Sequence, residues 1–161
     1  MTCDACSRIT ATERGENLFA IARLTTGYVV SHPTQYFRGY TLFVAKTCAP
    51  ELYALERSER DQFLHEMAEV AHAVARACNP RKLNYELLGN GVAHLHWHLF
   101  PRYGTDPHPG GPVWEDMRFL RNLWVEGAQL PDDERDELRR SILGTLETAD
   151  VTIERAFVAP R

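Results

Sequence analysis

Short apolar stretches bounded by turn residues predict five β-strands along the chain. The first two are expected at residues 18–24 and 28–31, and Thr25-Thr26-Gly27 between them is typical of a hairpin turn. The other three are expected at residues 40–45, 82–88 and 93–101. In the last of these, apolar and polar residues alternate strictly, which indicates a strand with one buried face.

Two further segments show apolar residues at helical spacing. The first carries the stripe Phe63, Met67, Val70, Ala71 and Val74. Ser58 is expected to cap the start of this helix, and Asn79-Pro80 is expected to end it. A second helix is expected to open at Pro131, because acidic residues follow directly and favour the positive end of the helix dipole. Strands grouped around one long helix predict an α+β fold with a five-stranded antiparallel sheet and a C-terminal helix.

Three histidines stand at alternate positions in the last predicted strand, in the run His94-Leu95-His96-Trp97-His98-Leu99-Phe100. The alternation predicts that all three imidazoles line one face. All three are poorly placed to bind a single metal ion together, because the outer two α-carbons of such a row lie about 13 Å apart. Two of the three could share a metal. A neutral imidazole that attacks an electrophile, with its neighbours holding the transferred group, suits the row better.

The run, followed by Pro101-Arg102-Tyr103, resembles the signature of the histidine triad (HIT) family. Residues 39–47, Gly-Tyr-Thr-Leu-Phe-Val-Ala-Lys-Thr, are similar to that family's strand Gly-His-Thr-Leu-Val-Ile-Pro-Lys-Thr. The resemblance implies hydrolases or transferases that act at the α-phosphate of nucleotides. It also implies that His96 is the nucleophile, forming a covalent nucleotidyl-histidine, and that His98 contacts the phosphoryl oxygens. We therefore expect one HIT-like domain over residues 1–161, with a core at 3–103 and a C-terminal loop and helical extension at 104–161.

A possible metal site begins at Cys3-Asp4-Ala5-Cys6. A structural zinc needs two more cysteine or histidine ligands. Zinc-containing HIT proteins take them from a histidine just after the Pro-Lys-Thr strand and from the first triad histidine, and the matching positions here are Cys48 and His94. The resemblance thus implies a zinc site of Cys3, Cys6, Cys48 and His94. The alternative is three free thiols with His94 turned to substrate.

Four residues are candidates for substrate binding. His32 stands where many HIT proteins have an acid that binds the ribose hydroxyls, and one of its ring nitrogens could still bond a ribose. Asn84 matches an asparagine of the neighbouring strand, Asn90 precedes the triad, and both are expected to donate to phosphate oxygens. Arg102, just beyond the triad, is expected either to pair with phosphate or to lie in solvent.

Three functions remain open: a hydrolase of dinucleoside polyphosphates such as diadenosine tetraphosphate, a nucleoside phosphoramidase, and a nucleotide-binding protein with little turnover. The net charge of −4 argues against nucleic acid or a membrane surface as partner. Four cysteines and no apparent export signal favour the cytoplasm. We expect a homodimer, because an edge strand, the apolar stripe of the long helix, Trp114 and Trp124 leave apolar area to cover.

Overall fold

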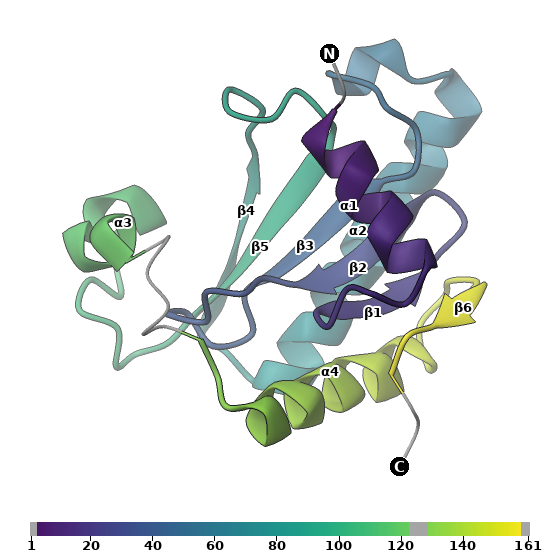
Figure 1. Ribbon diagram of the computed structural model, residues 1–161. Helices are drawn as coiled ribbons and strands as arrows, with labels where there is room; N and C mark the ends of the chain where they lie inside the picture. Colours follow the sequence, from purple (N-terminus) through teal and green to yellow (C-terminus); the bar gives the residue numbers. More distant parts are fainter. Residues whose placement is uncertain (1–2, 123–128, 159–161) are drawn as a thin grey trace.

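The computed structural model describes residues 3–122 and 129–158, which form one antiparallel sheet with helices on both of its faces (Figure 1). The sheet has the strand order β4-β5-β3-β2-β1-β6. Its strands are β1 Ala20–Arg23, β2 Gly27–Ser31, β3 Thr41–Ala45, β4 Lys82–Leu87, β5 His96–Arg102 and β6 Arg155–Ala156. The α-helices are α1 Asp4–Glu13, α2 Arg57–Cys78, α3 Met117–Asn122 and α4 Asp132–Leu146, and short 3-10 turns lie at Leu52–Ala54 and Val113–Glu115.

The α+β fold with an antiparallel sheet is confirmed, but the expected number of five strands is wrong because the sheet has six. The sixth strand, β6, pairs two residues with β1 after the chain has passed through α4. A strand of two residues has no detectable hydrophobic period, so the sequence pattern does not reveal it. The long helix begins at Arg57 after Glu56 and has no side-chain cap, so Ser58 lies inside its first turn and does not cap it.

The larger hydrophobic core lies between the sheet and helices α2 and α4. Phe63, Val70 and Val74 of α2 are fully buried and pack with Phe43 and Leu99 of the sheet. Helix α4 adds its own buried stripe of Leu138, Ile142, Leu143 and Leu146 to the same cluster. The apolar stripe of the long helix is therefore covered within one chain, and it does not require a second subunit.

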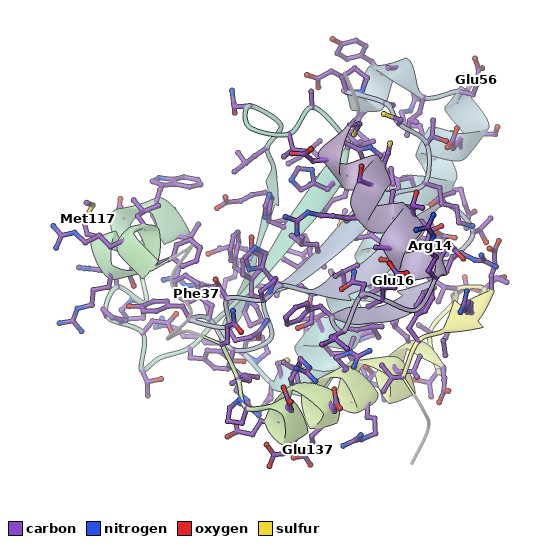
Figure 2. The ribbon with its side chains drawn as sticks, viewed as in Figure 1. Arg14, Glu16, Phe37, Glu56, Met117 and Glu137 are labelled. Atoms are coloured by element: carbon purple, nitrogen blue, oxygen red, sulfur yellow. The ribbon has the colours of Figure 1, made fainter. Side chains whose placement is uncertain are left out.

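The opposite face of the sheet carries α1 and the segment that contains α3. Helix α1 crosses in front of the strands in Figure 1, and Glu13 at its end bonds to the Tyr28 hydroxyl of β2 and to Arg23 of β1. A smaller aromatic cluster of Phe37, Tyr40, Phe100, Val113 and Phe119 attaches the α3 segment to the sheet. Phe37, labelled in Figure 2, lies at this junction, with its ring centroid 4.9 Å from that of Phe119.

Two tryptophans were expected to provide apolar area that a second subunit covers. Trp114 is 57% exposed beside the aromatic cluster, and Trp124 lies outside the described residues. Among the described residues, no helix combines the length and the apolar character needed to cross a membrane.

Candidate functional site

His96 and His98 share the face of β5 that is turned away from α2. They stand opposite Val44 and Leu42 of β3, whereas Trp97 stands opposite the fully buried Phe43. Because neighbours along a strand point to opposite faces, both imidazoles lie on the face that carries α1 and the aromatic cluster. Their ring centroids are 4.7 Å apart and both side chains are half-buried.

His94 does not belong to this row, because β5 begins only at His96. Its side chain is fully buried, and the ring Nε2 lies 2.8 Å from the carbonyl oxygen of Ala45. A carbonyl oxygen only accepts, so Nε2 carries the hydrogen and Nδ1 keeps a lone pair. Nδ1 faces the sulfur of Cys3 at 3.4 Å and that of Cys6 at 3.7 Å. His94 thus lies just before the strand and not within it, with its ring turned to the thiols at the start of α1.

The predicted zinc ligands lie together in the structure. One donor atom from each of Cys3, Cys6, Cys48 and His94 lies within 4.8 Å of the other three. In a tetrahedral zinc site, sulfur–nitrogen and sulfur–sulfur edges are about 3.6 and 3.8 Å, given the usual bond lengths. The two sulfur–Nδ1 distances match this geometry, and the Ala45 carbonyl fixes the His94 tautomer that a metal needs. The donor set therefore fits zinc.

His96 is oriented by the backbone of His94. Its Nδ1 lies 2.6 Å from the His94 carbonyl oxygen, so Nδ1 donates its hydrogen there and Nε2 keeps a lone pair. The acceptor belongs to the same segment, two residues earlier, and not to the neighbouring strand. This bond gives His96 the protonation pattern of an imidazole nucleophile.

His98 is contacted by a residue that the motif analysis did not single out. The Tyr40 hydroxyl lies 2.6 Å from Nδ1 of His98. Burial is the largest cause that lowers the pKa of His98, to about 3, so this imidazole is neutral at physiological pH. Burial also raises the pKa of Tyr40 far above its usual value. Strand register could have indicated Tyr40, because it precedes by two residues Leu42, the partner of His98.

Gly39 allows Tyr40 to reach this place. Its φ is +92°, a conformation that residues with a side chain rarely adopt. A Cβ at this position would also lie 2.5 Å from the sulfur of Cys78. Glycine is therefore required where the chain turns into β3.

His32 lies on the other side of the Tyr40 ring. The two rings stack with centroids 4.2 Å apart, and Nδ1 of His32 accepts the backbone N–H of Thr34 at 3.1 Å. Burial lowers the pKa of His32 to about 4, so its ring is neutral and carries its hydrogen on Nε2. His32 can thus act as a hydrogen-bond donor, which agrees with the expected bond through one nitrogen.

Arg102 has a different role from the one expected. Its side chain is buried, and its Nε donates to Asp106 at 2.8 Å. Nη1 donates to the Gly111 carbonyl and to Oδ1 of Asn84, and Nη2 donates to the His108 carbonyl. The guanidinium also lies 4.7 Å from the centre of the Phe37 ring. Arg102 therefore neither lies in solvent nor faces a phosphate; it holds the Gly- and Pro-rich loop 103–112 against the sheet.

We expect Arg102→Ala to lower the free energy of unfolding by about 3–5 kcal/mol, because it removes the ion-pair partner of Asp106, whose side chain is only 10% exposed. Urea denaturation of both proteins measures this change. Arg57→Ala is the matched control, because Arg57 pairs with Asp61 at 3.7 Å with 88% of its side chain exposed. The control is expected to change stability by less than about 1 kcal/mol. Equal stabilities of Arg102→Ala and the wild type would contradict the loop-holding role.

The two asparagines are placed differently. Asn84 of β4 stands opposite Phe100, so its half-buried side chain lies on the histidine face. Asn90 is exposed in the connection between β4 and β5, and the structure gives it no contact with the histidines. Glu86, which the motif analysis missed, stands directly opposite His98, and burial raises the pKa of its carboxyl. The sequence could have indicated Glu86, because it follows Asn84 by two residues in the same predicted strand and therefore shares its face.

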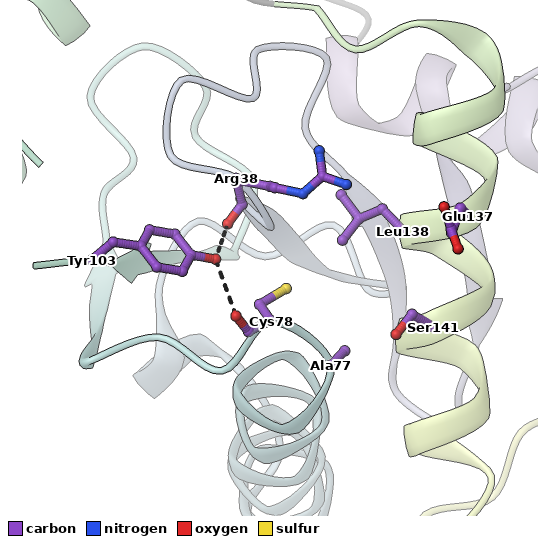
Figure 3. Close-up of a pocket in the computed structure, with 7 residues that line it drawn as sticks. All are labelled: Arg38, Ala77, Cys78, Tyr103, Glu137, Leu138 and Ser141. Atoms are coloured by element: carbon purple, nitrogen blue, oxygen red, sulfur yellow. Dashed lines mark hydrogen bonds between the residues drawn. The ribbon is translucent and has the colours of Figure 1, made fainter. Parts of the chain in front are cut away.

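A cavity of about 310 Å³ lies elsewhere, between the end of α2 and α4. Figure 3 shows it lined by Arg38, Cys78 and Tyr103, with the Tyr103 hydroxyl donating to the Arg38 carbonyl at 2.7 Å. It contains none of the predicted site residues. The candidate catalytic residues therefore lie on the histidine face of the sheet, and this cavity is separate from them.

An antiparallel α+β fold with a pair of histidines on one face of its sheet is the fold of the histidine triad proteins, a class that generally consists of nucleotide hydrolases or transferases. Residues 27–105 match the family model of the HIT domain, and the chain therefore contains a domain of the HIT family. Protein hit of Bacillus subtilis is 31% identical over 87 residues, which span 51% of this chain and 59% of that protein. The chain thus matches somewhat more than half the length of this relative.

Solved structures share the fold. A HIT protein from Sinorhizobium meliloti is 23% identical, with a TM-score of 0.64 and coverage of 83% of this chain and 93% of that one. A zinc-bound HIT family protein from Mycobacterium smegmatis is 21% identical, with a TM-score of 0.59 and coverage of 92% and 95%. In this chain, the four-donor cluster of Cys3, Cys6, Cys48 and His94 could hold a metal ion, and its donor set fits zinc.

Proposed function

We propose that this protein hydrolyses nucleotides at the α-phosphate through a covalent nucleotidyl-His96 intermediate. The observation that carries the proposal is the 2.6 Å bond from Nδ1 of His96 to the His94 carbonyl, which leaves the Nε2 lone pair of His96 free on the histidine face of the sheet. Imidazole nitrogen with a fixed tautomer is a competent nucleophile toward phosphorus. Nucleotide binding alone does not require a histidine with a fixed tautomer and a free Nε2 lone pair. We therefore prefer an enzyme to a binding protein with little turnover.

In the first step, Nε2 of His96 forms a bond to the α-phosphorus and the bond to the leaving group breaks. The electron pair of that bond departs with the leaving group, and Nδ1 keeps its hydrogen. In the second step, water adds to phosphorus, its proton passes to solvent, and the electron pair of the N–P bond returns to Nε2. The His94 carbonyl stabilises the positive charge that the ring carries between the two steps.

The surrounding donors suit the phosphoryl oxygens and the ribose. We assign Nε2–H of His98 and the amide of Asn84 to the non-bridging oxygens, and Nε2–H of His32 to a ribose hydroxyl. Asn90 remains a candidate phosphate donor, which requires its loop to approach the bound substrate. Arg102 contributes by holding loop 103–112 and Asn84 in place.

Among substrates, we propose dinucleoside polyphosphates such as diadenosine tetraphosphate, with nucleoside phosphoramidates as the alternative. Zinc, bound by Cys3, Cys6, Cys48 and His94, would supply structural cross-linking here, because its ligands are all protein groups. The thiols are all free of disulfides, which suits a reducing compartment, and we propose the cytoplasm as the location.

The proposal is tested by mixing the protein with diadenosine tetraphosphate and quenching in base within seconds. Intact-mass spectrometry is expected to show one adenylyl group per chain while product nucleotides accumulate. Peptide mapping is expected to place this group on the peptide that contains His96. An acid quench is the control, because a phosphorus–nitrogen bond to histidine is lost in acid and retained in base. Substrate turnover without any trapped adduct, or no turnover of either substrate class, would contradict the covalent mechanism.

We also propose a homodimer formed through β4. This strand ends the sheet, and Tyr85 and Leu88 at this edge are 47% and 51% exposed. An unpaired edge with exposed apolar side chains favours pairing with a second copy. Sedimentation at micromolar concentration is expected to give about twice the 18.4 kDa chain mass. A Tyr85→Lys, Leu88→Lys double variant is expected to sediment as a monomer, and a wild-type monomer would refute the dimer.

A further inference from the structure

Tyr40 is held rigidly beside His98. Its side chain is 2% exposed and its ring stacks between His32 and Phe100, with centroids 4.2 Å away on each side. Its hydroxyl lies 2.6 Å from Nδ1 of His98, which is its one hydrogen-bond partner within the described residues. The ring has little freedom to turn, so the hydroxyl and Nδ1 face each other permanently.

The direction of this bond follows from what each atom can do. A tyrosine hydroxyl has one hydrogen, and His98 Nδ1 is the acceptor available to it. If Nδ1 carried a hydrogen instead, the hydroxyl hydrogen would be buried without a partner, which costs free energy. His98 is therefore neutral with its hydrogen on Nε2, and His96 has the opposite tautomer. The lowered pKa of His98, about 3, and the raised pKa of Tyr40 agree with a neutral pair.

A neutral imidazole of this kind donates a hydrogen bond but does not release its proton. Loss of the Nε2 proton would require either an imidazolate or transfer of the Tyr40 proton to Nδ1, which leaves a buried tyrosinate. Both outcomes are unfavourable, because burial without a counterion disfavours the charged form. His98 thus stabilises charge on a phosphoryl oxygen without acting as a general acid.

Leaving groups differ in whether they need that proton. When a phosphoanhydride is cleaved, the P–O electron pair leaves on a phosphate oxygen, which is stable as an anion. When an alkylamine phosphoramidate is cleaved, the P–N electron pair leaves on nitrogen, which must take up a proton as the bond breaks. We infer that Tyr40 selects for phosphoanhydrides by holding His98 as a donor that cannot protonate an amine. This inference rests on the proposed function and names its substrate class.

The kinetic test compares two substrates that share the adenylyl group, diadenosine tetraphosphate and an alkylamine phosphoramidate of AMP. Wild-type kcat/KM is expected to be higher for the anhydride by about a hundredfold or more, the usual contribution of general acid catalysis. Tyr40→His introduces an imidazole that both accepts and donates protons, and it is expected to narrow this ratio by about tenfold or more. Tyr36→Phe, which removes one hydroxyl bond to Asp116, is the control and is expected to keep the ratio.

A spectroscopic test separates this role from simple packing. Nitrogen-15 NMR of the wild type, with zinc bound, is expected to show His98 with hydrogen on Nε2 and none on Nδ1. Tyr40→Phe removes the hydroxyl that donates to Nδ1 of His98, and the signals are expected to move toward a mixture of both tautomers. Wild-type His98 with hydrogen on Nδ1 would overturn the inference, whether or not the protein turns over nucleotides.

Two kinetic outcomes also overturn it. One is a wild-type protein that cleaves the phosphoramidate as fast as the anhydride. The other is phosphoramidate cleavage that is lost in Glu86→Gln, because Glu86 opposite His98 would then be the proton donor. Failure of the proposed function looks different: neither substrate adenylates His96, while the His98 tautomer remains as inferred.

Discussion

Replacing His96 by alanine is expected to abolish the trapped adduct and to lower kcat by about 10⁴-fold or more, as loss of a covalent nucleophile does in other enzymes. The reason is geometric. The His94 carbonyl prepares the Nε2 lone pair of His96 alone, since His98 has its hydrogen on Nε2 and His94 turns Nδ1 to the thiols. No second imidazole among the described residues can replace it on this face.

The measurement is initial velocity with diadenosine tetraphosphate, together with adduct mass after a basic quench. His72→Ala is the matched control, because this histidine is exposed on α2 and is expected to leave both values unchanged. His98→Ala is expected to slow adduct formation and still leave some adenylated protein, because only a stabilising donor is removed. A His96→Ala protein with a near wild-type rate would show that another group forms the bond to phosphorus.

The strands were predictable because their short apolar stretches are bounded by turn residues, and the long helix was predictable because its apolar residues recur at helical spacing. Helix α1 was missed, because its sequence Asp4–Glu13 is mostly polar and Thr12 is its only residue in the buried class. What holds α1 is specific contacts, such as Glu13 with Tyr28 and Arg23, which no periodicity encodes. Strand β6 is too short for a pattern, and its partner β1 lies more than 130 residues earlier.

The site residues also divide into those that the sequence pattern places correctly and those that only the tertiary structure places. His96 and His98 were placed correctly on one face by alternation, whereas His94 lies before the strand, where its Nε2–H bonds to the Ala45 carbonyl. Arg102 was expected at phosphate or in solvent because its position in the motif says nothing of the loop that folds over it. Its four acceptors come from residues 84, 106, 108 and 111, and only the tertiary structure brings these together.

Zinc binding is expected to stabilise the fold and to preserve the geometry of His96. Cys3 and Cys6 belong to the start of α1, Cys48 follows β3, and His94 precedes β5, so one ion would join three distant segments. Elemental analysis of protein never exposed to chelator is expected to give about one zinc per chain. Less than about a tenth of that amount would contradict the zinc site.

Cys48→Ser and Cys78→Ser form a matched pair for this prediction. Cys48 is one of the four clustered donors, whereas Cys78 lies at the end of α2 beside Gly39. Cys48→Ser is expected to lose most of the zinc and, when zinc was present at about a thousand times its dissociation constant, about 4 kcal/mol of stability. Cys78→Ser is expected to keep the zinc content of the wild type. Because the His94 carbonyl orients His96, loss of the metal is expected to lower kcat more than it raises KM. Equal zinc content in the two variants would show that Cys48 is not a ligand.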